Sequence, residues 1–237
     1  MTTTTAPRYG YADLPRLLSL MTGDEKHGPS ATSTLDVLWV LYDRVLDVSP
    51  ARAEDPERDR FLLSKGHGPM AYYAVLAAKG FLDPAVLPTF GAYESPLGHH
   101  PDRTLVPGVE ISSGSLGHGL PLAVGTSLGL RARARAAGHV RAPRVVVLVG
   151  DGELDEGSNH EALAYAGAAG LDGLTAVVVD NASSTHGWPG GIASRFSVEG
   201  WDAVTVDGRD HDALTRAFTR SPDGRPQAVV ATVEPRG

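Results

Sequence analysis

The chain contains no cysteine, which excludes disulfides, thiolate nucleophiles and any iron–sulfur cluster or zinc site held by its own cysteines. It also lacks a long hydrophobic run. The longest purely apolar stretches, such as residues 145–149, fall far short of the roughly 20 residues that span a bilayer. The threonine-rich start has no apolar segment of the kind found in signal peptides, so the sequence predicts a cytoplasmic protein.

Positive charge is scarce as well. Lysine and arginine number 21 against 28 aspartates and glutamates, which gives a formal net charge of −7. This balance disfavours a general nucleic-acid binder. One basic cluster is the local exception. Binding of nucleic acid or of an acidic partner is one interpretation of it, but we favour a solvated helix end, where cations complement the helix dipole. Its members are Arg131, Arg133, Arg135, Arg141 and Arg144.

The rest of the composition is that of a folded globular protein. Apolar residues make up 42% of the 237 residues and charged residues 21%, both near the usual averages. The 28 glycines and 17 prolines follow no collagen-like period and favour a loop-rich enzyme. No composition shift marks a linker between domains. We therefore predict a flexible tail over residues 1–10 and a single domain over residues 11–237.

Continuous β-branched runs alternate with helical patterns along the chain. This alternation predicts a doubly wound α/β domain, with a mostly parallel sheet covered by helices on both faces. Residues 50–60 are charged and are interpreted as a solvated connection. The expected strands lie at 61–63, 145–149, 175–179, 203–206 and 228–233, and the expected helices at 14–21, 32–48, 69–79, 116–135, 162–170 and 211–219.

Polar residues follow two of the expected strands. Gly150, Asp151 and Gly152 come after the first of these strands, and Asn181 follows the second, one strand–helix–strand unit later. In a parallel sheet both positions lie at the same edge. Carboxylate and amide oxygens suit Mg²⁺, and we expect Gly152 to open a helix whose free amides favour a phosphate. Together these residues predict a metal-bridged diphosphate site.

Histidines concentrate in glycine-rich turns rather than in periodic core positions. Taken together they favour a polar site that binds phosphate or sugar hydroxyls and moves protons, although any one of them can equally be a turn or core residue. None has the spacing of a zinc site. These residues are His27, His67, His99, His100, His118 and His160.

An ordered set of motifs makes the pattern specific. Over about residues 15–235, the chain resembles the thiamine-diphosphate-binding N-terminal part of transketolase, especially the separate N-terminal subunits of split transketolases. The motifs are Ser64-Lys65-Gly66-His67-Gly68, Gly108-Val109-Glu110, Gly114-Ser115-Leu116-Gly117-His118-Gly119, Gly150-Asp151-Gly152, Asp155-Glu156-Gly157, His160-Glu161-Ala162 and Asp180-Asn181.

The resemblance implies a role for each matching residue. Asp151 and Asn181 are expected to bind a metal through their side chains and Ser183 through its backbone carbonyl, with Mg²⁺, Ca²⁺ or Mn²⁺ as the ion. Gly152 is expected to donate its amide to the diphosphate, which His67 also touches. The other expected cofactor-binding residues are Gly114, Ser115, Leu116, Gly150, Glu153 and His186.

The resemblance also implies catalytic residues. His27 matches an active-site histidine, and His67 is counted with it. His100 matches the histidine that handles the hydroxyls of the donor sugar. Glu156 and Glu161 resemble acidic residues that link paired active sites at a dimer interface. The alternative is that they are ordinary glutamates in the first turn of a helix, stabilised by its dipole.

The implied reaction is the transfer of a two-carbon ketol unit from a ketose to an aldose, on thiamine diphosphate with a divalent metal. The chain stops before the pyrimidine-binding domain of the family. We therefore expect it to be inactive alone and to need a second polypeptide, in an α₂β₂ assembly.

Two departures from the family pattern bear on the substrate. His118 replaces the usual glutamine between two glycines, and the loop over residues 182–199 is short and atypical. An unphosphorylated or unusual ketose is therefore a candidate substrate. Two other functions stay open: a component that decarboxylates 2-oxo acids with the same cofactor, and a non-catalytic scaffold subunit.

Overall fold

A five-stranded parallel sheet forms the centre of the computed structural model, which describes residues 9–22, 28–184, 187–221 and 224–234. The strands lie in the order β1-β2-β3-β5-β4, and every neighbouring pair is parallel. This confirms the predicted parallel α/β sheet. The strands are β1 (Arg60–Leu63), β2 (Val145–Gly150), β3 (Leu174–Asp180), β4 (Asp202–Asp207) and β5 (Gln227–Thr232).

Strand β2 carries no polar side chain because helices cover both faces of the sheet. In β2, Val146 and Leu148 point into one hydrophobic core, while Val145, Val147 and Val149 point into the other. All five side chains are buried. A strand with one solvated face would alternate polar and apolar residues, so the continuous run in the sequence reflects this double burial.

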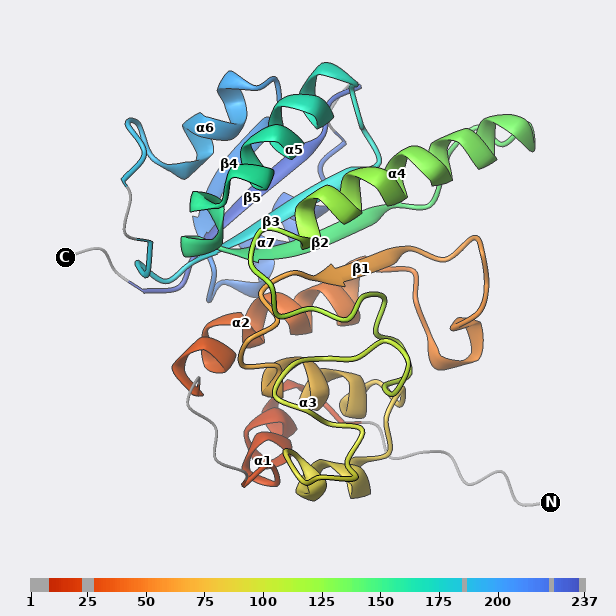
Figure 1. The fold of residues 1–237 in the computed structure, drawn as a ribbon, viewed down its shortest axis with the longest axis vertical. Helices are drawn as coiled ribbons and strands as arrows, with labels where there is room; N and C mark the ends of the chain where they lie inside the picture. The colour runs from red at the N-terminus through yellow and green to blue at the C-terminus, as the bar shows by residue number, and fades with distance from the viewer. Residues whose placement is uncertain (1–8, 23–27, 185–186, 222–223, 235–237) are drawn as a thin grey trace.

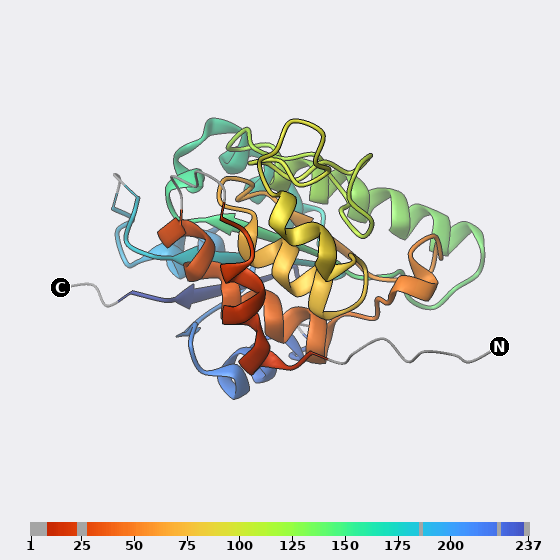
Figure 2. The same ribbon diagram turned by 90° about the horizontal axis from the view of Figure 1, so that it is seen from below.

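Seven α-helices in the described residues pack in two layers. Figure 1 shows α4, α5 and α6 on one side of the sheet and α1, α2 and α3 on the other. Figure 2 shows the same layers from below, with α1 and α3 toward the viewer. The second layer also contains α7. The helices are α1 (Leu14–Ser19), α2 (Gly28–Val40), α3 (Met70–Ala78), α4 (Gly119–Ala136), α5 (Gly157–Ala168), α6 (Ile192–Val198) and α7 (His211–Phe218).

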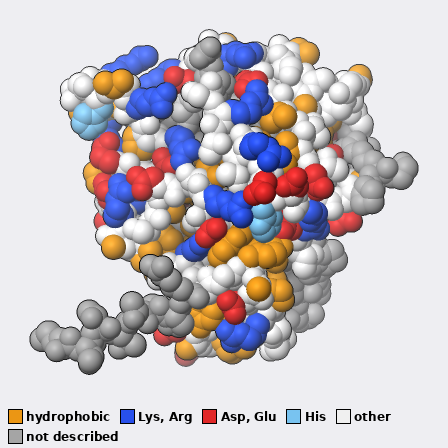
Figure 3. Space-filling model, turned by 180° about the vertical axis from the view of Figure 1, so that it is seen from behind, with side chains coloured by type: hydrophobic (Ala, Val, Ile, Leu, Met, Phe, Trp, Pro, Cys, Tyr) orange, Lys and Arg blue, Asp and Glu red, His pale blue; other side chains and the backbone are white. Residues whose placement is uncertain are grey.

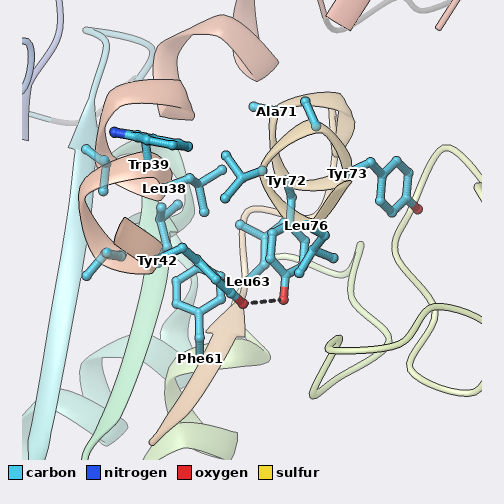
Figure 4. Packing of buried hydrophobic residues seen from close by; sticks show 14 of the residues in the cluster. Leu38, Trp39, Tyr42, Phe61, Leu63, Ala71, Tyr72, Tyr73 and Leu76 are labelled. Atoms are coloured by element: carbon cyan, nitrogen blue, oxygen red, sulfur yellow. Dashed lines mark hydrogen bonds between the residues drawn. The ribbon is translucent and has the colours of Figure 1, made fainter. Parts of the chain in front are cut away.

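An aromatic cluster packs α3 and the turn of π-helix that follows α2 (Leu41–Val45) against β1. The hydroxyls of Tyr42 and Tyr72 lie 3.0 Å apart, and both rings pack on Phe61 of β1 (Figure 4). Tyr72 also donates to the carbonyl of Gly108, at 3.1 Å. These contacts hold β1 in place, and with it the start of the turn that follows β1.

A buried carboxylate joins the first helices to the last strand–helix unit. Asp36 of α2 accepts hydrogen bonds from Tyr11, from Arg209 at 2.8 Å and from the His211 ring at 2.8 Å. Burial alone would raise the pKa of Asp36, but hydrogen bonds from these three donors outweigh it and lower the pKa.

Several expected boundaries are corrected. Gly152 opens only a four-residue 3-10 helix (Gly152–Asp155), because Glu156 is extended and α5 starts at Gly157. The helix expected at 32–48 starts earlier, at 28, and continues after 40 as a π-helical turn over Leu41–Val45. The helix expected at 116–135 begins at 119, and α6 was not expected at all.

The connection at 50–60 is less solvated than expected. Its Asp59 is buried and pairs with Arg144 at 2.8 Å, just before β2. Within the part of the chain that is described, no helix is both long and apolar enough to cross a membrane.

Candidate functional site

The predicted site residues gather at the carboxyl ends of β1, β2 and β3. The turn after β1 is tied to β2 because the amides of Ser64 and Lys65 both donate to the Leu148 carbonyl. The amide of Asp151, which follows β2, donates to the Val179 carbonyl of β3 at 3.2 Å. Asp151 and Asn181 therefore lie at one edge of two paired strands, as the spacing predicted.

Asp151 is fully buried at this edge. Its carboxylate accepts hydrogen bonds from the Ser183 hydroxyl at 2.6 Å and from the Ser184 amide at 2.9 Å. The intervening Ala182 has a φ of 57°, in the left-handed region that residues other than glycine rarely adopt. This turn folds the chain back after β3 and brings Ser183 to Asp151.

The oxygens at this position fit a divalent cation. The side-chain oxygen of Asn181 is buried and has no hydrogen-bond partner in the described part of the chain. A Cβ built on Gly152 would lie 3.7 Å from the Ser183 carbonyl oxygen, so that carbonyl is close to Asp151 as well. Burial of an amide oxygen without a hydrogen-bond donor costs free energy unless an ion or a water molecule binds to that oxygen. Carboxylate, amide and carbonyl oxygens are the donors that Mg²⁺ takes.

Conventional metal clusters are absent from the same region. No group of three His, Cys, Asp or Glu side chains comes together among residues 9–22, 28–184, 187–221 and 224–234. A cation beside Asp151 would therefore depend on the neutral oxygens of Asn181 and Ser183, with further ligands supplied by its own anion or by water.

Glu153 connects three segments of the site. It is buried, and its carboxylate accepts from the Ser64 hydroxyl, from the Gly117 amide at 3.0 Å and from the Gly150 amide at 3.3 Å. Burial raises its pKa, although these donors oppose the effect. Its oxygens are thus engaged by the protein. In this structure Glu153 positions the turns after β1 and β2, rather than pointing a free carboxylate at a ligand.

Lys65 is a buried cation that the sequence interpretation did not single out. It is 4% exposed, and its ammonium donates to Ser33 on α2 at 2.9 Å. Burial lowers its pKa to about 8, while the charges of Asp151 and Glu153 act in the opposite direction. Its ammonium makes no ion pair with another described residue. Because neither carboxylate is in ion-pair contact with it, the buried Lys65 ammonium is suited to an anionic ligand.

Close backbone approach brings the two glycine-rich turns together. A Cβ on Gly119 would overlap Ser64, and a Cβ on Gly66 would overlap Ser113, so both positions require glycine. The Gly119 amide also donates to the Ser64 hydroxyl at 3.0 Å. The turn that carries the half-buried His67 therefore lies against the segment 113–119.

A pocket of about 440 Å³ opens beside this segment. His100 lies against Gly114, where a Cβ would come within 2.6 Å of the imidazole, and Gly114 has a φ of 139°. His118 adds a second imidazole to the lining, and Leu116, which is exposed, is not part of it. The lining consists of His100, Ile111, Ser112, Ser113, Gly114, Ser115, His118, Gly119 and Leu122.

The remaining expected residues are not gathered into the pocket. Glu156 and Glu161 are exposed at the start and second turn of α5. The centroid of the His160 ring lies 5.3 Å from that of Trp188, a residue of the atypical loop, and the two rings are tilted relative to each other. His27 and His186 fall outside the described residues.

Comparison with known proteins gives one family match. The model of the transketolase thiamine diphosphate binding domain matches residues 16–233. Among curated proteins, "Ferredoxin fas2" of Rhodococcoides fascians is 60% identical over 95% of this chain and 72% of its own length. The present chain has no cysteine, so it offers no thiolate to an iron–sulfur cluster.

Two other curated relatives are named as single subunits of transketolases. One belongs to the apulose-4-phosphate transketolase of Actinobacillus succinogenes and is 35% identical, over 86% of this chain and 75% of its own length. The other belongs to the 6-deoxy-6-sulfo-D-fructose transketolase of a Clostridium species and is 32% identical, over 89% and 78%. The solved structure of a variant transketolase from Pichia stipitis has a TM-score of 0.80 and 26% identity, over 94% of this chain but 35% of that one.

Proposed function

The chain belongs to the transketolase family through its thiamine-diphosphate-binding domain, and from this premise we propose that it is the diphosphate-binding subunit of a two-chain, metal-dependent enzyme. The assembled enzyme would transfer a two-carbon ketol unit from a ketose to an aldose. Relatives named as separate transketolase subunits, matched over 75% and 78% of their own lengths, support the two-chain organisation.

The unpartnered oxygen of Asn181 carries the proposal. It lies at the same edge of the sheet as the buried carboxylate of Asp151, whose hydrogen-bond donors in the described part of the chain are both neutral. With the Ser183 carbonyl, these oxygens would hold a divalent cation, and the cation would bridge to a diphosphate. The amide of Gly152 and the imidazole of His67 would bind the diphosphate from the protein side.

The remaining residues would serve the substrate. When bound, thiamine diphosphate supplies the carbanion chemistry that breaks and forms the carbon–carbon bond. His100, exposed in the pocket beside Gly114, would bind a sugar hydroxyl and move its proton. His27 and His67 would take part in the same proton transfers. Gly114, Ser115 and Leu116 would lie along the cofactor.

A partner chain would complete the site. This chain spans about a third of the solved transketolases that it matches, 35% in the Pichia stipitis structure. We infer that the pyrimidine-binding part of the family is supplied by a second polypeptide in an α₂β₂ assembly, in line with the relatives named as single transketolase subunits. Glu156 and Glu161 are exposed, and neither carboxylate has a side-chain partner in the described part of this chain. Both are therefore available to contact groups of that assembly.

Calorimetric titration of thiamine diphosphate into the chain, with and without Mg²⁺, tests the cofactor site. Binding is expected to require Mg²⁺ and to weaken at least about tenfold in Asp151→Ala, because a metal ligand is lost. Glu54→Ala removes an exposed carboxylate elsewhere and should bind like the parent chain. Binding that needs no metal, or that survives Asp151→Ala, would contradict the assigned metal site.

The reaction itself is tested on the assembly with its partner chain. Ketol transfer between a ketose and an aldose is the expected activity. Release of CO₂ from a 2-oxo acid without ketol transfer would instead favour the decarboxylating alternative. An assembly that binds no thiamine diphosphate at all would leave the scaffold function as the remaining explanation.

A further inference from the structure

A second cavity, of about 530 Å³, lies at the opposite edge of the sheet. It is lined by Arg144, which immediately precedes β2, by Gly173 before β3 and by Gln227, the first residue of β5. Strands β2 and β3 are six and seven residues long, which places this edge about 20 Å from Asp151. The cavity is therefore separate from the candidate site.

The lining of this cavity is strongly basic in an otherwise acidic protein. It includes five arginines, whereas its only carboxylate among the described residues is Asp172. The whole chain has a net charge of −7. Figure 3 shows that Lys and Arg side chains gather in the upper part of the face opposite to that of Figure 1. The five are Arg131, Arg135, Arg141, Arg144 and Arg220.

Two of the five charges are already neutralised. Arg144 pairs with the buried Asp59 at 2.8 Å, and Arg220 makes a two-pronged contact with Asp202 at 2.6 and 2.7 Å. These pairs fix the guanidinium groups in place, but they leave little charge for a ligand.

The other three guanidinium groups have no carboxylate partner in the described part of the chain. Arg131 donates only to the carbonyls of Ala169 and Gly170, at 3.0 and 3.1 Å. Arg135 and Arg141 are exposed and make no hydrogen bond or ion pair with any described residue. The cavity thus holds three uncompensated cations against the single carboxylate of Asp172. Arg133 of the same sequence cluster lies outside this lining and pairs with Glu57 at 2.9 Å, and a solvated helix end does not account for the gathering of the others around one cavity.

Part of the cavity lining is apolar. Ala134 and Phe218 are buried in it, and Ala142 and Pro143 form part of the wall. The volume falls in the usual range of small-molecule sites, about 300–1,000 Å³. A guanidinium matches the oxygens of a phosphate group, whereas an apolar stretch of lining suits a flat ring.

From this combination we propose that the cavity is a second ligand site, which binds a nucleotide-like phosphorylated molecule without a divalent metal. The phosphates contact Arg131, Arg135 and Arg141, and the flat ring lies toward Phe218. The competing explanation is that these arginines only complement the C-terminal ends of α4 and α5, where carbonyls attract cations. Arg131 does so, but Arg135 and Arg141 bond to no carbonyl of the described residues.

Calorimetric titration of ATP into the full chain, in excess EDTA and at low salt, tests the proposal. The chelator removes the divalent metal that the candidate site requires. Binding is expected to weaken at least about tenfold in the Arg135→Ala/Arg141→Ala double variant and to fall as salt is added. Adenosine, which lacks phosphate, should bind much more weakly than ATP. Because both arginines are exposed and unpartnered among the described residues, the double variant should unfold at the same temperature as the parent chain.

Two further variants locate the binding. Arg16→Ala removes an exposed arginine from α1 and should leave ATP affinity unchanged, as should Asp151→Ala at the opposite edge. Absence of ATP binding, or binding that the double variant does not weaken, would overturn the proposal and leave the arginines as surface and helix-end groups. ATP binding that is lost in Asp151→Ala would overturn it as well, because the ligand would then occupy the candidate site.

Discussion

Replacement of Glu153 by alanine tests whether this carboxylate holds the candidate site together. Glu153 is 2% exposed and accepts from the amides of Gly117 and Gly150 and from the Ser64 hydroxyl. Alanine removes the acceptor and leaves the two buried amides without it. The hydroxyl can rotate to a new partner, but the two backbone donors cannot.

The expected loss of stability follows from those two donors. Each buried donor left without an acceptor costs about 1–3 kcal/mol, which gives about 4 kcal/mol for the pair. Removal of a carboxylate whose pKa is raised by burial returns part of this, since the charged form is disfavoured there. We therefore expect Glu153→Ala to lower the free energy of unfolding by about 3 kcal/mol. In a domain of this size, the corresponding fall in Tm is about 6–12 °C.

Urea unfolding, followed by circular dichroism, measures the effect. Glu153→Gln keeps one acceptor and should lose about half as much stability. Glu161→Ala, which truncates an exposed glutamate of the same neighbourhood, should stay within about 0.5 kcal/mol of the parent chain. A Glu153→Ala variant as stable as Glu161→Ala would refute the view that Glu153 fastens these turns.

Three further substitutions probe other parts of the molecule. Lys65→Met should weaken binding of Mg²⁺–pyrophosphate about tenfold or more in calorimetry, and Lys65→Arg should keep most of it, since the buried charge is retained. Asp36→Asn should lower the free energy of unfolding by about 2 kcal/mol at pH 7, because three donors lose a charged acceptor. The folded-state pKa of Asp36 lies below its unfolded value. The difference in free energy of unfolding between the parent chain and Asp36→Asn should therefore be complete above about pH 4 and decrease as the pH falls through the folded-state pKa. A difference that does not change with pH would contradict this role of Asp36. Gly119→Ala should destabilise by about 2 kcal/mol through overlap with Ser64, whereas Gly125→Ala, with open space around it, should stabilise slightly in thermal unfolding.

The fold could be predicted from the sequence because its strands are buried on both faces. The continuous apolar run at 145–149, four valines and a leucine, is typical of an inner strand of a parallel sheet. In the structure this run forms β2, which lies between β1 and β3. The seven-residue α6 was missed because it is too short for a helical period to stand out. The helix expected at Gly152 is only a four-residue 3-10 helix. The extended Glu156, which separates it from α5, leaves no pattern in the sequence.

The site could be predicted in part, for a similar reason. The spacing of Asp151 and Asn181 fixes their edge of the sheet, since one strand–helix–strand unit separates them. The contact of Ser183 with Asp151 depends on the left-handed conformation of Ala182. That conformation could not be predicted, because alanine rarely adopts it. Lys65 was overlooked because lysines in glycine-rich turns are mostly exposed, and only packing reveals its burial.

The central claim is that Asp151, Asn181 and Ser183 hold the metal of a diphosphate site, and locating the metal tests it most directly. Crystals of the full chain grown with Mn²⁺ and thiamine diphosphate would show the ion by its anomalous scattering. We expect a single strong peak within about 2.3 Å of the Asp151 carboxylate, the Asn181 side-chain oxygen and the Ser183 carbonyl, with diphosphate oxygens completing the shell. A bound diphosphate with the manganese elsewhere, or with Asn181 turned away from it, would contradict the claim.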